Sequence, residues 1–285
     1  MASPSEIAYI RECLIQNMRI DGRGAFDCRS CEFELGIVSQ AAGSARLRLG
    51  STDVIVCVKI ELGHPAPITP NQGSLKVSVE CSSCASPEFI GRGGDQWAAF
   101  MSQILERSLS TSSGSSGVDL TQLIVVPGKT CWRLFVDGLV LNDDGNVLDA
   151  LSLAAFMALQ DTRIPHVSVA AGAGGGASDD DAEPELELDD DPEHCVRLDM
   201  ARVPVVVTVG LVKDHPIIDA SLAEERSFET ALHCAVNAQG CLCASSLSGG
   251  AGKPATAGVS PAVLGSLQEE AVKVARKYLS DLLKK

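Results

Sequence analysis

The sequence predicts an α+β fold, and three observations support this prediction. Strand-like runs rich in β-branched residues come in groups instead of alternating singly with helices, which disfavours a repeated βαβ plan. Residues 146–162 form a helical pattern that is apolar on nearly all sides, as expected for a helix buried on several faces. An amphipathic pattern over residues 261–283 predicts a closing helix that begins at Ser260 and Pro261.

Residues 1–170 are predicted to form a first half in which strands surround helices. Ile7, Ile10 and Leu14 lie on one stripe of a short helix at residues 7–18. A second helix is expected at residues 95–108, where apolar residues recur in steps of three and four. Alternating or β-branched residues predict strands at 31–38, 45–49, 54–62, 74–80, 120–126 and 131–141.

Residues 195–285 are predicted to form a second half of similar plan, in which strands precede the closing helix. Between the halves, residues 171–194 contain a Gly/Ala run and then an acidic run. Few apolar residues and dense like charge predict a disordered insert there. The strands of the second half are expected at 196–199, 203–212, 216–219, 229–238 and 240–246.

The negative charge of the chain is unevenly placed. The formal net charge is −14 over 285 residues, but ten acids lie within residues 179–193, so the rest carries only −4. The acidic balance is therefore weak evidence against a nucleic-acid partner. No segment reaches the roughly 18–20 apolar residues of a membrane span, and the N-terminus lacks the pattern of a signal peptide. We expect a soluble, intracellular protein with no membrane partner.

The eleven cysteines are scattered and are expected to be thiols in a reducing compartment. Two CxxC pairs, Cys28/Cys31 and Cys81/Cys84, are separated by 49 residues, and no histidine lies near either pair. This spacing is unlike that of a zinc ribbon, so we interpret these cysteines as small apolar residues. The five histidines also form no ligand spacing, and we expect no metal and no cofactor.

A carboxylate cluster near the end of a predicted strand leaves two interpretations open. Asp219, Glu224 and Glu225 could bind Mg²⁺ through their oxygens. More often such acids form a solvated turn or the first turn of a helix, where acids suit the helix dipole.

Seven segments, in this order, resemble motifs of the RNase PH family, and together they span roughly residues 5–280 apart from the insert. The resemblance implies an RNase PH-like fold, with a duplicated β-α-β core whose first part is like domain 2 of ribosomal protein S5. It also implies that six such folds form a ring around a channel for single-stranded RNA. The segments are RIDGRG at 19–24, GSARLRLGSTD at 43–53, PEFIGRGGD at 87–95, CWRLFVD at 131–137, DGNVLDA at 144–150, DTRIP at 161–165 and DASLAEE at 219–225.

The same resemblance implies a subunit with no catalytic residues. Active members cleave RNA 3′ ends by phosphorolysis and carry a Gly-Ser-Arg phosphate-binding turn where this chain has Asn146, Val147 and Leu148. Placing phosphate against Val and Leu without a cation would be strongly unfavourable. Active members also pair two Asp residues six apart, and here the positions hold Asp219 and the longer Glu225.

Contact with RNA remains an expectation for two arginines. Arg107 matches a helix from which related subunits present Arg toward the RNA path, although Ser110 stands where a second Arg is expected. Arg92 lies in a Gly-rich helix-entry loop whose amides could meet a phosphate. Such contacts would be to backbone phosphates and therefore independent of base sequence.

By resemblance, the leading hypothesis is a non-catalytic ring subunit of the RNA exosome that supports ribosomal RNA maturation and mRNA turnover. Its expected partners are other RNase PH-like subunits in a hetero-hexameric ring, joined partly by strand-edge pairing, RNA-binding cap subunits and single-stranded RNA. Its expected locations are the nucleus, including the nucleolus, and the cytoplasm. The alternatives are an active phosphorolytic 3′-to-5′ exoribonuclease and an unrelated globular scaffold.

Overall fold

The computed structural model describes residues 3–91, 93–110, 116–169, 186–189, 191, 194–250 and 258–282. Its helices are α1 (Pro4–Ile15), α2 (Gly93–Leu109), α3 (Val147–Asp161), α4 (Leu222–Glu225) and α5 (Pro261–Leu282), with 3₁₀ turns η1 (Pro87–Phe89) and η2 (Leu120–Leu123). Its strands are β1 (Cys31–Leu35), β2 (Gly43–Leu49), β3 (Thr52–Gly63), β4 (Ser74–Cys81), β5 (Ile124–Val126), β6 (Thr130–Asn142), β7 (Arg163–Ile164), β8 (Val167–Val169), β9 (Leu186–Leu188), β10 (Val196–Arg197), β11 (Val205–Val212), β12 (His215–Ile218), β13 (Thr230–Val236) and β14 (Leu242–Ser248).

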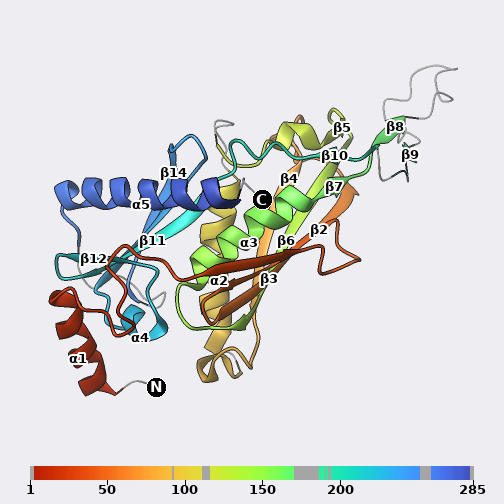
Figure 1. Cartoon of the computed structure of the whole chain (residues 1–285). Coiled ribbons are helices and arrows are strands. Elements are labelled where there is room, and N and C mark those ends of the chain that lie inside the picture. Colours follow the sequence, from red (N-terminus) through yellow and green to blue (C-terminus); the bar gives the residue numbers. More distant parts are fainter. Residues whose placement is uncertain are drawn as a thin grey trace, which may run out of the picture.

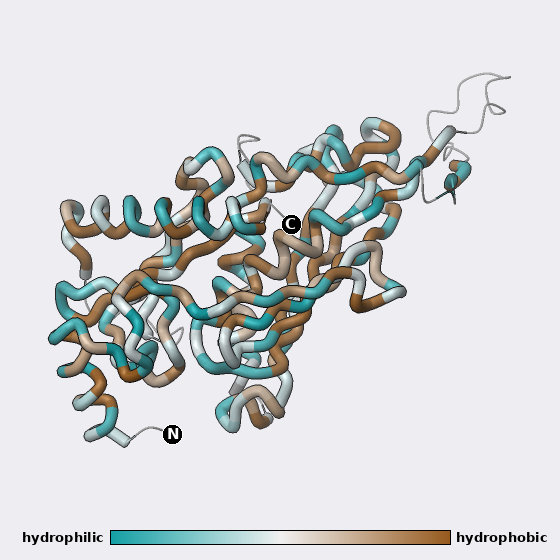
Figure 2. The backbone as a smooth tube through the Cα atoms, in the orientation of Figure 1, coloured by the Kyte–Doolittle hydropathy of each residue, from teal (hydrophilic) through white to brown (hydrophobic). Residues whose placement is uncertain are grey.

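Helix α3 is the centre of the packing. Every residue from Val147 to Leu159 is buried, because α3 packs against β2 and β3 on one side and against β11 on the other (Figure 1). Burial on both sides explains why this helix is apolar all round. Figure 2 shows hydrophobic residues gathered along the strands that face it, whereas α5 alternates hydrophobic and hydrophilic residues around its turns.

The first sheet has the strand order β1-β2-β3-β6-β4, and β5 pairs with β6 outside this path. Its pairs are antiparallel except β4 and β6, which run parallel. Helix α2 lies in the connection between these two strands and packs against β4. A parallel pair needs such a crossover, because a tight hairpin can join only antiparallel strands.

The second sheet has the order β12-β11-β13-β14 and is antiparallel throughout. Helix α5 packs against β11 and β13, and α2 contacts β11 and β14. The amphipathic helix α5 buries a stripe that includes Leu267, Ala271 and Tyr278. No helix in the described ranges is long and apolar enough to cross a lipid bilayer.

The α+β prediction is confirmed, and most predicted elements appear within a few residues of their expected bounds. The prediction for one segment was wrong. A strand was expected at residues 120–126, but its first four residues, Leu120–Leu123, form the 3₁₀ turn η2. The Asp119 side chain accepts a hydrogen bond from the amide of Thr121, and this local bond competes with strand pairing.

The predicted insert at 171–194 lies largely outside the described residues. Within it, Leu186–Leu188 forms β9, which pairs with Val167–Val169. The domain bounds 1–170, 171–194 and 195–285 stay a prediction. Helices and strands of both halves share one hydrophobic core, which includes Leu47, Leu151 and Val207.

Replacing Ser102 with alanine is expected to lower the free energy of unfolding by about 1 kcal/mol. Ser102 lies on α2, and its hydroxyl accepts a hydrogen bond from the amide of Val79 at 2.9 Å on strand β4. The variant leaves that amide unpaired. Urea unfolding would measure the change, with Ser266→Ala on the exposed side of α5 as the matched control. A loss no larger than that of the control would show that water replaces the Ser102 hydroxyl.

Candidate functional site

The carboxylate of Asp219 lies at the centre of a cluster of positively charged side chains. Asp219 follows β12, has a backbone φ of 49°, and its side chain is fully buried. The guanidinium of Arg29 donates to it at 2.8 Å and that of Arg23 at 2.9 Å, while the side-chain amide of Asn146 donates at 3.0 Å. Two arginines and an amide therefore occupy the oxygens that a metal ion would need.

The electrostatics of Asp219 follow from these contacts. Burial alone would raise its pKa, but the hydrogen bonds and charge of Arg29 and the amide of Asn146 hold the pKa below its usual value. Asp219 is consequently an ionised anchor for two segments distant in sequence. Arg29 also donates to the carbonyl oxygens of Asp144 and Gly145, both at 3.0 Å, so the same guanidinium supports the turn before α3.

A second arginine–carboxylate pair lies beside the first. Arg19 donates to both carboxylate oxygens of Glu224, at 3.0 and 2.7 Å, and the two side chains are only 2% and 1% exposed. Glu224 also closes a capping box with Ser221 at the start of α4. The interpretation of the acidic cluster as a helix first turn is thus confirmed for Glu224 and Glu225.

The start of α3 is the place where the resemblance puts a phosphate-binding turn. Asn146 is its N-cap, in the left-handed conformation with φ 57° and ψ 37°, and its side chain makes no capping bond. The carboxylate of Glu225 instead accepts a hydrogen bond from the backbone amide of Asn146 at 2.7 Å. A helix N-terminus is where an external phosphate would bind, and the side chain of Glu225 occupies that position at the start of α3.

Glu225 lies in surroundings that disfavour its charge. The residue is half-buried, and its carboxylate points inward to Asn146. Burial raises its pKa to about 8, the negative charges of Asp143 and Asp149 add to the increase, and the hydrogen bond from Asn146 opposes it. At neutral pH this carboxyl is mainly protonated and can hold its place without a strong cation.

The cavity beside this helix end is too small for a phosphate. Its volume is about 30 Å³, which is room for one or two waters. Val147 and Leu148 are each 3% exposed and form part of its wall, and its lining contains no Lys or Arg. An anion placed there would lose its hydration without gaining a cation.

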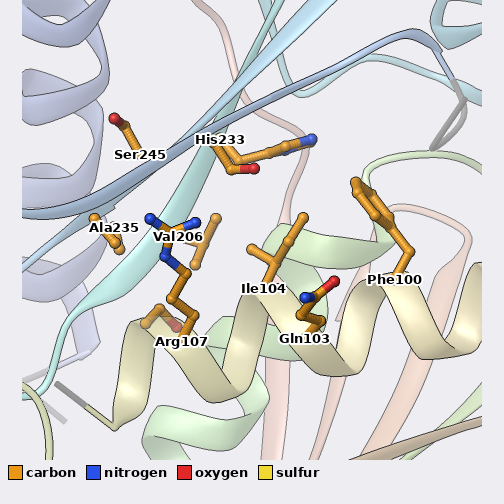
Figure 3. Close-up of a pocket in the computed structure, with 11 residues that line it drawn as sticks. Phe100, Gln103, Ile104, Arg107, Val206, His233, Ala235 and Ser245 are labelled. Atoms are coloured by element: carbon orange, nitrogen blue, oxygen red, sulfur yellow. The ribbon is translucent and has the colours of Figure 1, made fainter. Parts of the chain in front are cut away.

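Of the two predicted RNA-contacting residues, the described part of the chain includes Arg107. Arg107 is exposed on the last turns of α2, where it lines a separate hollow (Figure 3). Arg92 lies outside the described residues. Neither expectation of RNA contact is tested by the geometry. Sequence reasoning missed Arg19, Arg23 and Arg29, whose acidic partners lie about 190 or more positions away, so no spacing in the chain reveals the pairs.

The cysteines and acidic residues show no assembled metal centre in the part of the chain that the structure describes. All eleven cysteines are free thiols. No group of three His, Cys, Asp or Glu side chains within the described ranges has an arrangement that could hold a metal ion.

Comparison with known proteins identifies the family. The family model for the first domain of the 3′ exoribonuclease family, RNase PH, matches residues 27–165. A Dictyostelium discoideum protein, named provisionally as an exosome complex exonuclease, RRP42, is 33% identical over 85% of this chain and 86% of its own. The chain belongs to the RNase PH family. An RNase PH-family relative from Pyrococcus abyssi, named exosome complex component Rrp42, is 35% identical over 76% of this chain and 73% of its own.

Solved structures agree with this RNase PH-family assignment. A chain of the Archaeoglobus fulgidus exosome with RNA bound to the active site matches 98% of this chain and 98% of its own, with a TM-score of 0.79 and 29% identity. A chain of an archaeal exosome core has a TM-score of 0.75 at 29% identity and matches 99% of this chain and 97% of its own. Rice Rrp46, at 20% identity and a TM-score of 0.62, shares the fold.

Proposed function

We propose that this chain is a non-catalytic ring subunit of an RNA exosome that supports 3′-to-5′ RNA processing and degradation. The observation that carries the non-catalytic part is the Glu225 carboxylate on the Asn146 amide at 2.7 Å. It fills the helix N-terminus that would otherwise bind phosphate, in a cavity of about 30 Å³ lined by no Lys or Arg. The assembly part is supported by the names of the relatives and by the archaeal exosome chains that share the fold.

Asp219, the other acid at the positions where active family members pair two Asp residues, is not free to contact a substrate. Asp219 is held by Arg23, Arg29 and Asn146, so its oxygens are already engaged. A catalytic group must reach the reacting atoms within hydrogen-bond distance, and Asp219 would first have to break contacts with two arginines. The side chains of Asp219 and Glu225 therefore have a structural role, because their hydrogen bonds hold α3 and the N-terminal segment in position.

A phosphorolysis assay tests the catalytic part. Purified full-length chain, incubated with single-stranded RNA and inorganic phosphate, is expected to release no nucleoside diphosphates above a no-protein blank. An active member of the RNase PH family provides the positive control. Phosphate-dependent release of nucleoside diphosphates would overturn the non-catalytic proposal and favour the phosphorolytic exoribonuclease.

Co-purification tests the assembly part. A tagged chain expressed in its own cells is expected to recover other RNase PH-like subunits in a hetero-hexameric ring, together with RNA-binding cap subunits, from nuclear, nucleolar and cytoplasmic fractions. Recovery as a lone monomer from all fractions would overturn the assembly part of the proposal.

A further inference from the structure

Two cysteines lie two residues apart where β13 turns into β14. Cys241 directly precedes β14 and is exposed, and Cys243 is the second residue of β14 and is half-buried. Both are free thiols, and β14 is the outer strand of the second sheet (Figure 1). Successive side chains of an extended chain point to opposite faces, so residues two apart share a face. The spacing therefore places two thiols side by side at an accessible sheet edge.

The backbone around this pair is held by its own hydrogen bonds. The register between β13 and β14 shifts after Ala235, and Cys243 is the residue that the ladder skips. The Sγ of Cys243 donates to the carbonyl oxygen of Cys241 at 3.4 Å. The side-chain oxygen of Asn237 accepts from the backbone amide of Cys241 at 2.9 Å, and the Asn237 amide donates to the Cys241 carbonyl at 3.1 Å. The turn is thus arranged before any ligand binds.

The sulfur of Cys243 receives hydrogen bonds from groups outside the pair. Burial raises the pKa of its thiol, hydrogen bonds from the Ser116 hydroxyl and the Asn237 backbone amide lower it, and the charge of Cys241 raises it. Donors aimed at a ligand atom are the outer contacts that orient the ligands of a metal ion. A cation between the two sulfurs would also remove the repulsion between two thiolates.

A positively charged side chain lies against the same turn. The guanidinium of Arg276 on α5 donates to the carbonyl oxygen of Gln239 at 3.4 Å, and a Cβ at Gly240 would collide with it. Gly240, with a φ of 78°, lets the guanidinium approach the backbone next to Cys241. Two thiolates around a monovalent cation carry a net negative charge, and a nearby guanidinium stabilises such a complex.

We propose that Cys241 and Cys243 bind one soft monovalent cation, monovalent copper, as a pair of thiolate ligands. This site goes beyond the proposed function and does not depend on it. Thiolates are soft ligands that select monovalent copper over harder ions. Binding replaces the two thiol protons by one cation, and both protons go to solvent.

Two other fates of the pair fit the geometry less well. A structural zinc ion needs four ligands, and within the described ranges no group of three His, Cys, Asp or Glu side chains is arranged to hold a metal ion. A disulfide is disfavoured because residues two apart in an extended chain have Cα atoms about 6.6 Å apart, close to the upper limit of about 6.8 Å. A bridging ion with metal–sulfur distances of about 2.3 Å spans about 4.6 Å between sulfurs. The expectation of no metal was drawn from the CxxC pairs and the histidines, whose spacings differ from this one.

Competition for copper tests the site. The reduced full-length chain would be titrated anaerobically with monovalent copper against a colorimetric chelator of that ion. The native chain is expected to retain one copper ion more than the double variant Cys241→Ser with Cys243→Ser, and each single variant should lose the same ion. Cys84→Ser removes an exposed cysteine elsewhere and is the matched control, with native retention expected. Arg276→Gln is expected to weaken retention about tenfold.

Protection from alkylation locates the ion in the native chain and needs no variant. Copper is expected to protect Cys241 and Cys243 from iodoacetamide, measured by peptide mass spectrometry, and to leave Cys84 reactive. Copper should also raise the Tm of the native chain but not that of the double variant, and the same melts show whether the variants fold. Equal retention by the native chain and the folded double variant, or protection confined to other cysteines, would overturn the proposal. A disulfide between the two cysteines in the copper-treated chain would overturn it as well.

Discussion

Replacing Arg19 with methionine is expected to lower the free energy of unfolding by about 3–5 kcal/mol. The Arg19 and Glu224 side chains are 2% and 1% exposed, so the variant leaves a carboxylate buried without its cation. Arg19 also donates to the carbonyl oxygens of Ile218 at 3.1 Å and Asp219 at 2.8 Å, and these bonds are lost as well. The effect is large because one side chain satisfies groups on two segments about 200 residues away in sequence.

A double variant separates the unpaired charge from the loss of packing. In Arg19→Met with Glu224→Gln, the glutamine can keep the capping contact with Ser221 and carries no charge. We expect the double variant to recover more than half of the stability that the single variant loses. Lys273→Met on the exposed pair with Glu270 is the matched control, and its expected cost is far smaller because solvent screens an exposed ion pair. Urea unfolding at pH 7 gives all these values, and a loss below 1 kcal/mol for Arg19→Met would contradict the buried-pair interpretation.

Sequence patterns predicted the fold better than the site. The all-round apolar pattern of α3 and the stripe of α5 follow directly from what each helix packs against, so periodicity suffices to find them. The turn η2 was misread because a single Asp119 side-chain bond decides between turn and strand. The alternation of apolar and polar residues along the chain carries no information about such a hydrogen bond.

The candidate site depends on contacts between distant segments. The replacement of the phosphate-binding turn by Asn146, Val147 and Leu148 was visible in the sequence, because apolar residues cannot hold an anion. The position of Glu225 on the Asn146 amide was not visible, since it requires α4 to lie against the start of α3. The likeness to RNase PH motifs located the place, and the three-dimensional arrangement showed what fills it.

The carboxyl of Glu225 gives the protein a pH-dependent stability. Its pKa in the folded chain is about 8, above the 4.5 of an exposed Glu. A raised pKa contributes stability that is fully present below about pH 4.5 and is lost as the pH rises through about 8, at up to about 1.4 kcal/mol per pH unit. His233, whose pKa is lowered to about 4, acts in the opposite sense, because its contribution is present above pH 6.5 and is lost on acidification. Between pH 6.5 and 8.5 His233 stays neutral in the folded chain, so the change in stability over this interval reports the acids whose pKa values are raised.

Glu225→Gln is expected to abolish most of the stability loss over that interval. The native chain should lose about 2 kcal/mol between pH 6.5 and 8.5 from Glu225, and the variant should not, since glutamine carries no ionisable group and its carbonyl can still accept from Asn146. Asp149, with a pKa of about 7, titrates over the same interval in both proteins, and because its charge interacts with that of Glu225, its contribution cancels only in part in the difference. Glu269→Gln, at an exposed position on α5, is the matched control and should follow the native curve. Parallel pH curves for Glu225→Gln and the native chain would mean that the carboxyl is ionised throughout, and the start of α3 would then hold a charged anion of its own.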